Sequence, residues 1–134
     1  MSIVVDSSVL VRALAVDSGA DGQWAEAILD SGPLHAPEFV YAEVTDALRK
    51  LERAKDITTA DAIAAHEDLL EINLELFSFE PFAERIWELR HNLTSYDAWY
   101  VAVAEALGLP LATLDERLAR ASGPTCDFLT PRQA

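Results

Sequence analysis

Four acidic residues that lie far apart in the sequence could together hold a divalent metal ion. Asp6 and Asp115 each follow a short apolar run, and Glu43 and Asp97 lie in segments with helical periodicity. Carboxylate oxygens are hard donors that suit Mg²⁺ or Mn²⁺, whereas zinc prefers the nitrogen and sulfur ligands of His and Cys. Without a cation, four neighbouring carboxylates would repel one another and raise their pKa values. We therefore predict a Mg²⁺ site at these residues, with Mn²⁺ as a substitute.

Three of these acids also have an ordinary structural explanation as helix caps. Asp6 and Asp115 stand at expected helix starts, where a carboxylate that accepts from free backbone N–H groups contributes about 1 kcal/mol. Asp97 lies three residues after Thr94, as in a capping box with Asp in place of Glu. Taken singly, each of the three is explained better by capping than by metal binding.

Glu43 is the exception, because its expected helix places it away from both ends. Val40 lies three residues before it and Ala47 four after, so its side chain falls on or beside the apolar stripe. Arg49 and Lys50 belong to the same helix but are not three or four residues away. A carboxylate near a buried face is costly unless it is paired or bound to a cation. Glu43 by itself therefore favours the metal site.

Apolar runs and amphipathic segments predict the elements that must position these acids. Strands are expected at the apolar runs 3–5, 34–36, 74–79, 111–113 and 126–129. Helices are expected over 9–14, 22–29, 38–54, from Thr58 or Thr59 to about 71, 81–91 and 95–107, with a short one after Asp115. Strands that alternate with helices predict an α/β fold whose central, mainly parallel sheet is covered on both faces.

The domain organisation is simple. The chain contains no linker, repeat or low-complexity segment, so residues 1–134 are expected to form a single domain, with residues 130–134 as a frayed tail. Gly108 is expected to end the helix that begins near residue 95. The helix that ends near residue 71 is expected to turn three large apolar side chains inward, namely Ile63, Leu69 and Leu70.

The carboxyl ends of the parallel strands are expected to bring the acids together. Open parallel sheets place their functional crevice outside this edge, and Asp6 and Asp115 both come at the end of an expected strand. Asp97 shares a helix face with Tyr100 and Val101, so we expect it at the crevice end of a helix packed on the core. Two strand-end aspartates and two helix carboxylates could thus converge on one pocket.

The charge balance restricts the classes of partner. Ten basic residues against 23 acidic ones give a net charge of −13, which disfavours non-specific binding to a phosphate backbone. The acidity could reflect carboxylates around a cation, a surface built for a basic partner, or solubility alone. No apolar run approaches the ~20 residues of a membrane span, and the N-terminus has no signal-peptide pattern. We expect no membrane association, and the single Cys126 fits a reducing cytoplasm.

Three stretches, residues 3–10, 37–44 and 92–118, carry the four acids in a distinctive context. The first reads Ile-Val-Val-Asp-Ser-Ser-Val-Leu and the second Pro-Glu-Phe-Val-Tyr-Ala-Glu-Val. The third is the most specific and contains Thr-Ser-Tyr-Asp-Ala-Trp-Tyr followed later by Thr-Leu-Asp-Glu-Arg-Leu. Together they resemble the PIN-domain ribonucleases, and within that family the VapC toxins of bacterial toxin–antitoxin pairs. The likeness extends over essentially the whole chain and is least distinctive between about residues 55 and 90.

This resemblance implies a three-layer α/β/α sandwich in which one pocket is lined by Asp6, Glu43, Asp97 and Asp115. It implies a Mg²⁺- or Mn²⁺-dependent endoribonuclease that cuts tRNA or rRNA and leaves 3′-hydroxyl and 5′-phosphate ends. It also implies neutralisation by a cognate antitoxin that wraps the toxin and often inserts an arginine into the acidic pocket. Toxins of this kind usually form homodimers, and pairs of dimers in the antitoxin complex.

The hypothesis for the mechanism gives the four acids different roles. Asp6, Asp97 and Asp115 would ligate Mg²⁺ directly or through water, and Glu43 would hold a metal-bound water. The ion would lower the pKa of that water and stabilise charge on the phosphoryl oxygens during an in-line displacement. The residues leave open whether one ion or two act.

Other side chains carry weaker signals. Ser7 and Thr113 could orient the carboxylates, or could be ordinary cap and strand-end residues. Trp99 or Tyr96 could stack on a base, although Trp99 and Tyr100 are more typical of a core or dimer surface. Phosphate contacts could come from the arginines at four positions, Arg12, Arg90, Arg117 and Arg120.

Two alternatives compete with a metal-dependent nuclease. A non-catalytic protein of the same fold could bind its partner through the acidic crevice, but the presence of all four acids argues against a degenerate site. Haloacid-dehalogenase phosphatases need a second Asp two residues after the first, where this chain has Ser8. Receiver domains need a lysine after a late strand, and the only lysines are Lys50 and Lys55. We therefore set aside phosphoryl transfer to an aspartate.

Overall fold

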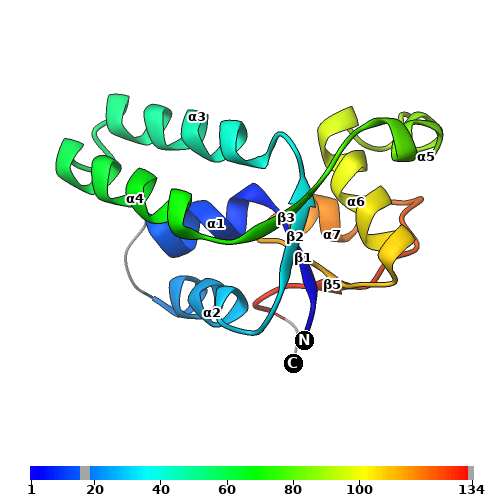
Figure 1. Cartoon of the computed structure of the whole chain (residues 1–134), viewed down its shortest axis with the longest axis horizontal. Helices are drawn as coiled ribbons and strands as arrows, with labels where there is room; N and C mark the ends of the chain where they lie inside the picture. Colours follow the sequence, from blue (N-terminus) through cyan, green and yellow to red (C-terminus); the bar gives the residue numbers. More distant parts are fainter. Residues whose placement is uncertain (16–18, 133–134) are drawn as a thin grey trace.

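A parallel sheet forms the centre of the protein in the computed structural model, which describes residues 1–15 and 19–132 (Figure 1). Within these residues the sheet has five strands, β1 (Ile3–Val5), β2 (Leu34–Pro37), β3 (Leu74–Phe77), β4 (Leu111–Ala112) and β5 (Phe128–Leu129). Their spatial order is β3-β2-β1-β4-β5, and the pairing is parallel throughout. The predicted α/β fold with a mainly parallel sheet is confirmed.

The middle strand β1 is completely buried, which explains its run of β-branched residues. Ile3, Val4 and Val5 expose no surface, as expected of a parallel strand that is covered on both faces. Val4 pairs with His35 of β2 on one side and with Leu111 of β4 on the other. Because β1 and β4 are neighbours and point the same way, the residues that follow them emerge at the same edge of the sheet.

Helices cover both faces of this sheet. They are α1 (Ser7–Leu14), α2 (Ala20–Leu29), α3 (Val40–Arg53), α4 (Thr59–Glu71), the 3₁₀-helix η1 (Glu80–Phe82), α5 (Ala83–Glu88), α6 (Ser95–Leu107) and α7 (Glu116–Ala119). In Figure 1, α1 to α4 lie on one side of the sheet and α5 and α6 on the other. Helix α6 packs on β1, β2 and β4, and α1 contacts α2, α3 and α4. The three-layer α/β/α sandwich is therefore present.

Helix α3 begins later than its sequence pattern predicts. The N–H of Glu38 donates to the carbonyl of Phe77 at 2.9 Å, which continues the ladder between β2 and β3 for one more residue. The helix consequently begins at Val40, and Glu43 lies in its first turn instead of in its middle. Backbone dipoles at a helix N-terminus stabilise a nearby negative charge, so Glu43 has more support than the sequence suggested.

The helix expected over 81–91 is also shorter. The chain forms a 3₁₀ turn at η1 and then only the short helix α5, which ends at Glu88. Beyond it, the N–H groups of Leu89, Arg90 and Asn92 each donate to a carbonyl three residues earlier. Such bonds tighten the chain into 3₁₀ geometry and end an α-helix. The resulting turn leads into the N-terminus of α6.

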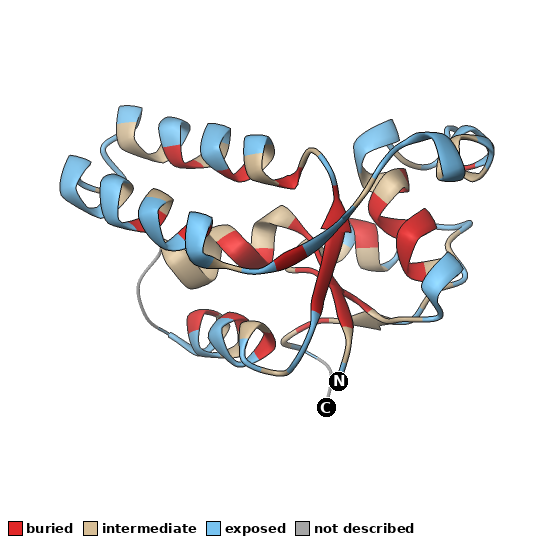
Figure 2. Cartoon of the chain, in the orientation of Figure 1, coloured by how far each residue is buried: buried red, intermediate tan, exposed pale blue. Residues whose placement is uncertain are grey.

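Helix α4 turns a different face inward from the one predicted. Ala65 and Leu69 are buried against the core, whereas Ile63 and Leu70 are 56% and 65% exposed. The helix packs on α1 and α3 through this narrow stripe of Ala65 and Leu69, and Figure 2 shows the outer surface of α4 exposed. The prediction that Leu69 faces inward is confirmed, and those for Ile63 and Leu70 are wrong.

The ends of the helices and of the chain add three observations. Gly108 ends α6 in the left-handed conformation, at φ 66°, as predicted. Of the tail expected to fray, Thr130 is buried and Arg132 lies 3.3 Å from a carboxylate oxygen of Asp21, while residues 133–134 lie outside the described residues. Among the described helices, none has both the length and the hydropathy of a membrane span.

Candidate active site

Asp6 is a buried carboxylate at the carboxyl end of β1. It caps α1, because its Oδ1 accepts from the N–H of Ser8 at 3.0 Å and from that of Val9 at 3.3 Å. Its Oδ2 accepts from the hydroxyl of Thr113. Burial raises the pKa of Asp6 to about 6 against the lowering effect of these hydrogen bonds, and the negative charge of Asp97 raises it further. Asp6 is thus both a helix cap and a member of an acidic group.

Two hydroxyls tie Asp6 to the residues that follow β4. Thr113, which is fully buried, donates to Asp6 and accepts from the N–H of Asp115 at 2.9 Å. The hydroxyl of Ser8 donates to Oδ1 of Asp6 and accepts from the N–H of Leu114 at 3.0 Å. Thr113 thus contacts an acid, as expected of a hydroxyl that could orient one, and Ser8 is a second such hydroxyl that the sequence did not single out. These bonds hold the ends of β1 and β4 in a fixed relation.

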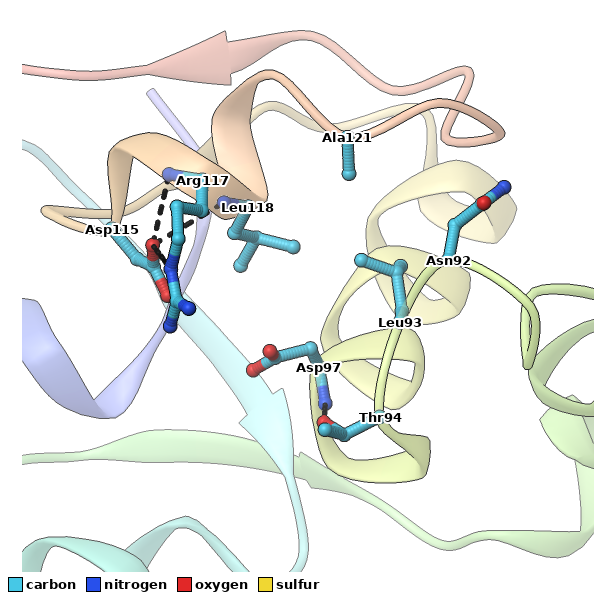
Figure 3. Close-up of a pocket in the computed structure, with 8 residues that line it drawn as sticks. All are labelled: Asn92, Leu93, Thr94, Asp97, Asp115, Arg117, Leu118 and Ala121. Atoms are coloured by element: carbon cyan, nitrogen blue, oxygen red, sulfur yellow. Dashed lines mark hydrogen bonds and ion pairs between the residues drawn. The ribbon is translucent and has the colours of Figure 1, made fainter.

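Asp97 and Asp115 face the same pocket from different helices. Asp115 caps α7 by accepting at Oδ1 from the N–H of Arg117 at 3.0 Å and from that of Leu118 at 3.3 Å. Asp97 lies in the first turn of α6, where its N–H donates to the hydroxyl of Thr94 at 3.1 Å. Figure 3 shows the Asp97 carboxylate turned towards the side of the pocket where Asp115 lies.

The pocket between them is an open cavity of about 290 Å³. It is bounded by α6 and the turn before it on one side and by α7 on the other, and its lining residues are Asn92, Leu93, Thr94, Asp97, Asp115, Arg117, Leu118 and Ala121 (Figure 3). Half burial raises the pKa of Asp97, and the negative charges of Asp115 and Glu43 raise it further. The pocket is therefore acidic and faces solvent.

Glu43 joins this group through a buried tyrosine. The hydroxyl of Tyr100 donates to Oε1 of Glu43 at 2.8 Å, and Tyr100 is only 1% exposed. Burial raises the pKa of Tyr100, and the charges of Glu43 and Asp6 raise it further, so its hydroxyl keeps its proton and remains a donor. Of the core and the dimer surface expected for Tyr100, the structure shows the core, and its contact with Glu43 was not predicted.

The four predicted acids thus come together at one edge of the sheet. They lie close enough for their charges to interact: the charges of Asp115 and Glu43 raise the pKa of Asp97 beyond the effect of its burial, and the charge of Asp97 adds to the effect of burial on the pKa of Asp6. Among residues 1–15 and 19–132, however, no group of three or more His, Cys, Asp or Glu side chains is spaced to hold a metal ion. Mutual repulsion opposes a tighter arrangement, and Mg²⁺ usually takes one or two carboxylates together with water and phosphate oxygens. The donors fit an open Mg²⁺ site better than a closed cage.

Of the four arginines proposed for phosphate contact, one lines the acidic pocket and three do not. Arg117 lines the acidic pocket and is 91% exposed, with its Nε 3.9 Å from Oδ1 of Asp115. The guanidinium of Arg90 instead lies 4.2 Å from the ring centroid of Trp87 on the outer surface of the turn after α5. Arg12 and Arg120 are absent from the lining of the pocket. Of the four, Arg117 is placed to meet a phosphate at this site.

Comparison with known proteins identifies the family. The model of the PIN domain matches residues 3–124. The chain is 40% identical over 126 residues to ribonuclease VapC1 of Mycobacterium tuberculosis, covering 93% of this chain and 94% of that protein. The fold resembles that of PAE2754 from Pyrobaculum aerophilum, with a TM-score of 0.70 and 25% identity over 96% of this chain and 83% of that one.

A toxin–antitoxin complex from Klebsiella pneumoniae has the same fold, with a TM-score of 0.66 over 98% of this chain and 99% of the matched one. Its sequence identity is 18%, so this likeness concerns the fold alone. The family match spans nearly the whole chain and includes all four acidic residues that line up at the edge of the sheet. The chain therefore belongs to the PIN-domain family, and its similarity to VapC ribonucleases places it among the VapC-like members.

Proposed function

We propose that this protein is a Mg²⁺-dependent endoribonuclease toxin that a cognate antitoxin neutralises. The observation that carries the proposal is the convergence of Asp6, Glu43, Asp97 and Asp115 on one edge of the sheet, where burial and, to a smaller extent, the charges of neighbouring acids raise the pKa of Asp97 and of Asp6. The VapC ribonucleases among its relatives support RNA hydrolysis. A cluster of hard oxygen donors supports Mg²⁺, with Mn²⁺ as a substitute.

Asp6, Asp97 and Asp115 would hold the ion, and Glu43 would orient a water molecule beside it. When bound, Mg²⁺ supplies a Lewis acid that offsets negative charge on phosphoryl oxygens and favours deprotonation of water. The chain contributes orientation, since Thr113 and Ser8 fix the two oxygens of Asp6, and Tyr100 fixes one oxygen of Glu43. The carboxylates of Asp6 and Glu43 are thereby restricted to a narrow range of positions before substrate binds.

The residue proposed to contact the RNA lies at the same edge of the sheet. Arg117 would contact a phosphate next to the scissile one, because its exposed guanidinium lines the pocket that holds Asp97 and Asp115. Hydrolysis would leave 3′-hydroxyl and 5′-phosphate ends, as the family resemblance implies. tRNA or rRNA is the proposed target, and the cytoplasm is the proposed location.

The antitoxin is proposed as a protein with a basic segment. A net charge of −13 and an acidic pocket open to solvent both favour a cationic partner. An arginine in the pocket would contact the carboxylates that Mg²⁺ needs, so that antitoxin binding and metal binding would exclude one another. The toxin–antitoxin complex with the same fold supports this kind of assembly.

A homodimer is proposed for the toxin itself. Ile63 and Leu70 lie seven residues apart on α4, so they share a helix face, and both are more than half exposed. A pair of large apolar side chains on one exposed face is suited to contact with another chain. Light scattering on the purified toxin measures its mass, and a purely monomeric toxin at micromolar concentration would contradict this part of the proposal.

The non-catalytic alternative draws support from one observation, the absence of a ready group of three metal ligands in the described part of the chain. Cleavage of RNA by the antitoxin-free protein separates the two functions. We expect cleavage with Mg²⁺ or Mn²⁺ and none with a chelator. Asp97→Asn should abolish it, whereas Asp68→Asn, which changes an exposed acid on α4, should cleave as the wild type does. Wild-type activity of the Asp97→Asn protein would show that the metal mechanism is wrong.

A further inference from the structure

A group of aromatic rings lies beside the acidic pocket, next to Tyr100, whose hydroxyl holds Glu43. Phe39, at the start of α3, is its centre: its ring centroid is 5.3 Å from that of Tyr96 and 5.1 Å from that of Trp99. It also meets the ring of the buried Tyr100 edge-on at 5.4 Å. Phe79 packs edge-on against Trp99 at 5.3 Å. The contacts hold the ring of Phe39 on several sides.

Tyr96 is the member of this group that the fold leaves in solvent. It is 60% exposed, although its ring stands edge-on against Phe39. Residues Tyr96 and Asp97 are adjacent in the first turn of α6, so their side chains point about 100° apart around the helix axis. Asp97 lines the acidic pocket, whereas Tyr96 lines a second cavity.

This second cavity, here called the aromatic pocket, is lined by Phe39, Ala42, Glu43 and Tyr96. Its volume of about 300 Å³ is at the small end of ligand pockets, which run from ~300 to ~1,000 Å³. Glu43 belongs both to its wall and to the acidic group. A ligand in the aromatic pocket would therefore lie directly beside the place where the phosphodiester is cleaved.

We propose that the aromatic pocket binds the base of a nucleotide next to the cleaved phosphodiester, with the base stacked on Tyr96. The inference rests on the proposed RNA cleavage and adds a base-binding site to it. Proteins recognise single-stranded RNA by stacking unpaired bases on aromatic side chains. The pocket exposes mainly apolar surface, which suits the face of a base, and it is open to solvent, so the ribose and phosphate of the nucleotide could extend from it towards the acids.

The charge of the protein strengthens this argument. A chain with a net charge of −13 repels the RNA backbone, so its affinity for RNA must come largely from contacts that do not depend on phosphate charge. Stacking on a base is such a contact. The ring of Tyr96 is already positioned by Phe39, which is itself held by Trp99 and Tyr100. Little side-chain freedom is then lost when a base binds.

A scan with abasic nucleotides tests the proposal. The probe is a single-stranded RNA oligonucleotide that contains one mapped cleavage site, made with one abasic residue at each position in turn. For the wild type, the abasic residue at one position beside the cleaved bond should lower kcat/KM about tenfold, mainly through KM. Tyr96→Ala should lower kcat/KM for the intact RNA by a similar factor, and the abasic residue at that position should then cause no further loss.

Two companion variants sharpen the test. Tyr96→Leu keeps an apolar contact with Phe39 but has no aromatic ring, so it should lose the abasic penalty as Tyr96→Ala does. Because Leu fills more of the space than Ala, this variant checks that the effect of Tyr96→Ala is not caused by a change in folding. Tyr96→Phe keeps the ring and should restore the penalty at the abasic position. The control is Trp87→Ala, which removes an aromatic side chain of similar exposure, 66%, that lies on α5 outside the aromatic pocket.

The outcomes separate this inference from the proposed function. If the wild type cleaves RNA but Tyr96→Ala leaves every abasic penalty unchanged, the base-binding site is wrong and the nuclease stands. If the wild type cleaves no RNA, the proposed function fails and the inference fails with it. If Tyr96→Ala changes the mass measured by light scattering and not the abasic profile, the aromatic pocket is an interface between copies of the chain, which also overturns the proposal.

Discussion

The hydroxyl of Tyr100 donates a hydrogen bond of 2.8 Å to Oε1 of Glu43, from a position 57 residues away in the chain. This bond joins α6 to α3 across the edge of the sheet and holds Glu43, the one acid that the sequence did not explain as a helix cap. Tyr100 is buried and Glu43 is half-buried, so neither group can exchange the contact freely for water. Glu43 therefore depends on Tyr100 for its orientation.

Tyr100→Phe should lower cleavage without abolishing it. The hydroxyl is lost while the ring contact with Phe39 remains, so Glu43 becomes free to turn. We expect kcat to fall about tenfold with little change in KM, and the free energy of unfolding to fall by about 1 kcal/mol.

The matched control for that variant is Tyr41→Phe. Its hydroxyl donates to the carbonyl of Ile72 at 2.9 Å, away from the acids. It should cost a similar free energy of unfolding in urea titrations and leave kcat unchanged. Equal kcat values for the two variants would mean that the Tyr100 hydroxyl serves stability alone.

The burial of Asp6 should make the stability of the protein depend on pH when a chelator is present. The folded-state pKa of about 6 is higher than the ordinary 3.8, so the folded chain binds more protons than the unfolded chain between these values. The contribution of Asp6 to stability is then full below about pH 4 and is lost as the pH rises through about 6. The shift corresponds to an order of 3 kcal/mol.

The contribution of Asp6 can be separated from those of other acids with Asp6→Asn. Burial raises the pKa of Glu105, but the hydrogen bonds from Arg85 and Thr125 outweigh it and lower the pKa overall. The effect of Glu105 on stability is therefore opposite to that of Asp6, and because it is the same in both proteins it cancels in the comparison. The difference between the unfolding free energies of the wild type and Asp6→Asn should change between pH 4 and 6. A difference that stays constant over this range would contradict the raised pKa.

Mn²⁺ should stabilise the antitoxin-free protein through Asp97. An ion that binds only the folded state at a concentration one hundred times its Kd adds ~2.7 kcal/mol to the free energy of unfolding. The melting temperature should therefore rise as Mn²⁺ is titrated into the wild type, and Asp68→Asn should respond equally. Asp97→Asn should lose most of the shift. No shift in the wild type at millimolar Mn²⁺ would favour the non-catalytic alternative.

Arg117 should contribute to RNA binding and Arg120 should not. Arg117 lines the acidic pocket, whereas Arg120 follows α7 outside it. One lost phosphate contact reduces the slope of log affinity against log salt by ~0.7 for a single strand. RNA binding is measured in proteins that also carry Asp97→Asn, so that the RNA is not cleaved. In this background Arg117→Ala should reduce the slope, and Arg120→Ala should leave it unchanged. A loss of slope in both variants would point to a general effect of surface charge.

Much of the fold could be predicted because its signals are local. The apolar β-branched run Ile3–Val5 is the pattern of a strand buried on both faces, and Gly108 ends α6 because it adopts a positive φ without strain. Because neighbouring parallel strands end at the same edge of a sheet, the proximity of Asp6 and Asp115 could be predicted without knowing any contact between side chains.

Other features were decided only by packing between elements. Periodicity defines which residues share a helix face, but it does not define how far the helix is rotated against its neighbours. For this reason Ile63 and Leu70 are exposed although they were expected to face inward, and the contact of Ser8 with Asp6 was not predicted.

The sequence by itself therefore determined the order of strands and helices along the chain and the edge of the sheet at which the four candidate acids meet. Only the tertiary structure decided what each acid contacts: Thr113 and Ser8 for Asp6, and Tyr100 for Glu43. The physical reason is the range of the forces involved. Strand and helix signals arise between residues a few positions apart, whereas a hydrogen bond between side chains 57 or 107 residues apart depends on how whole elements pack.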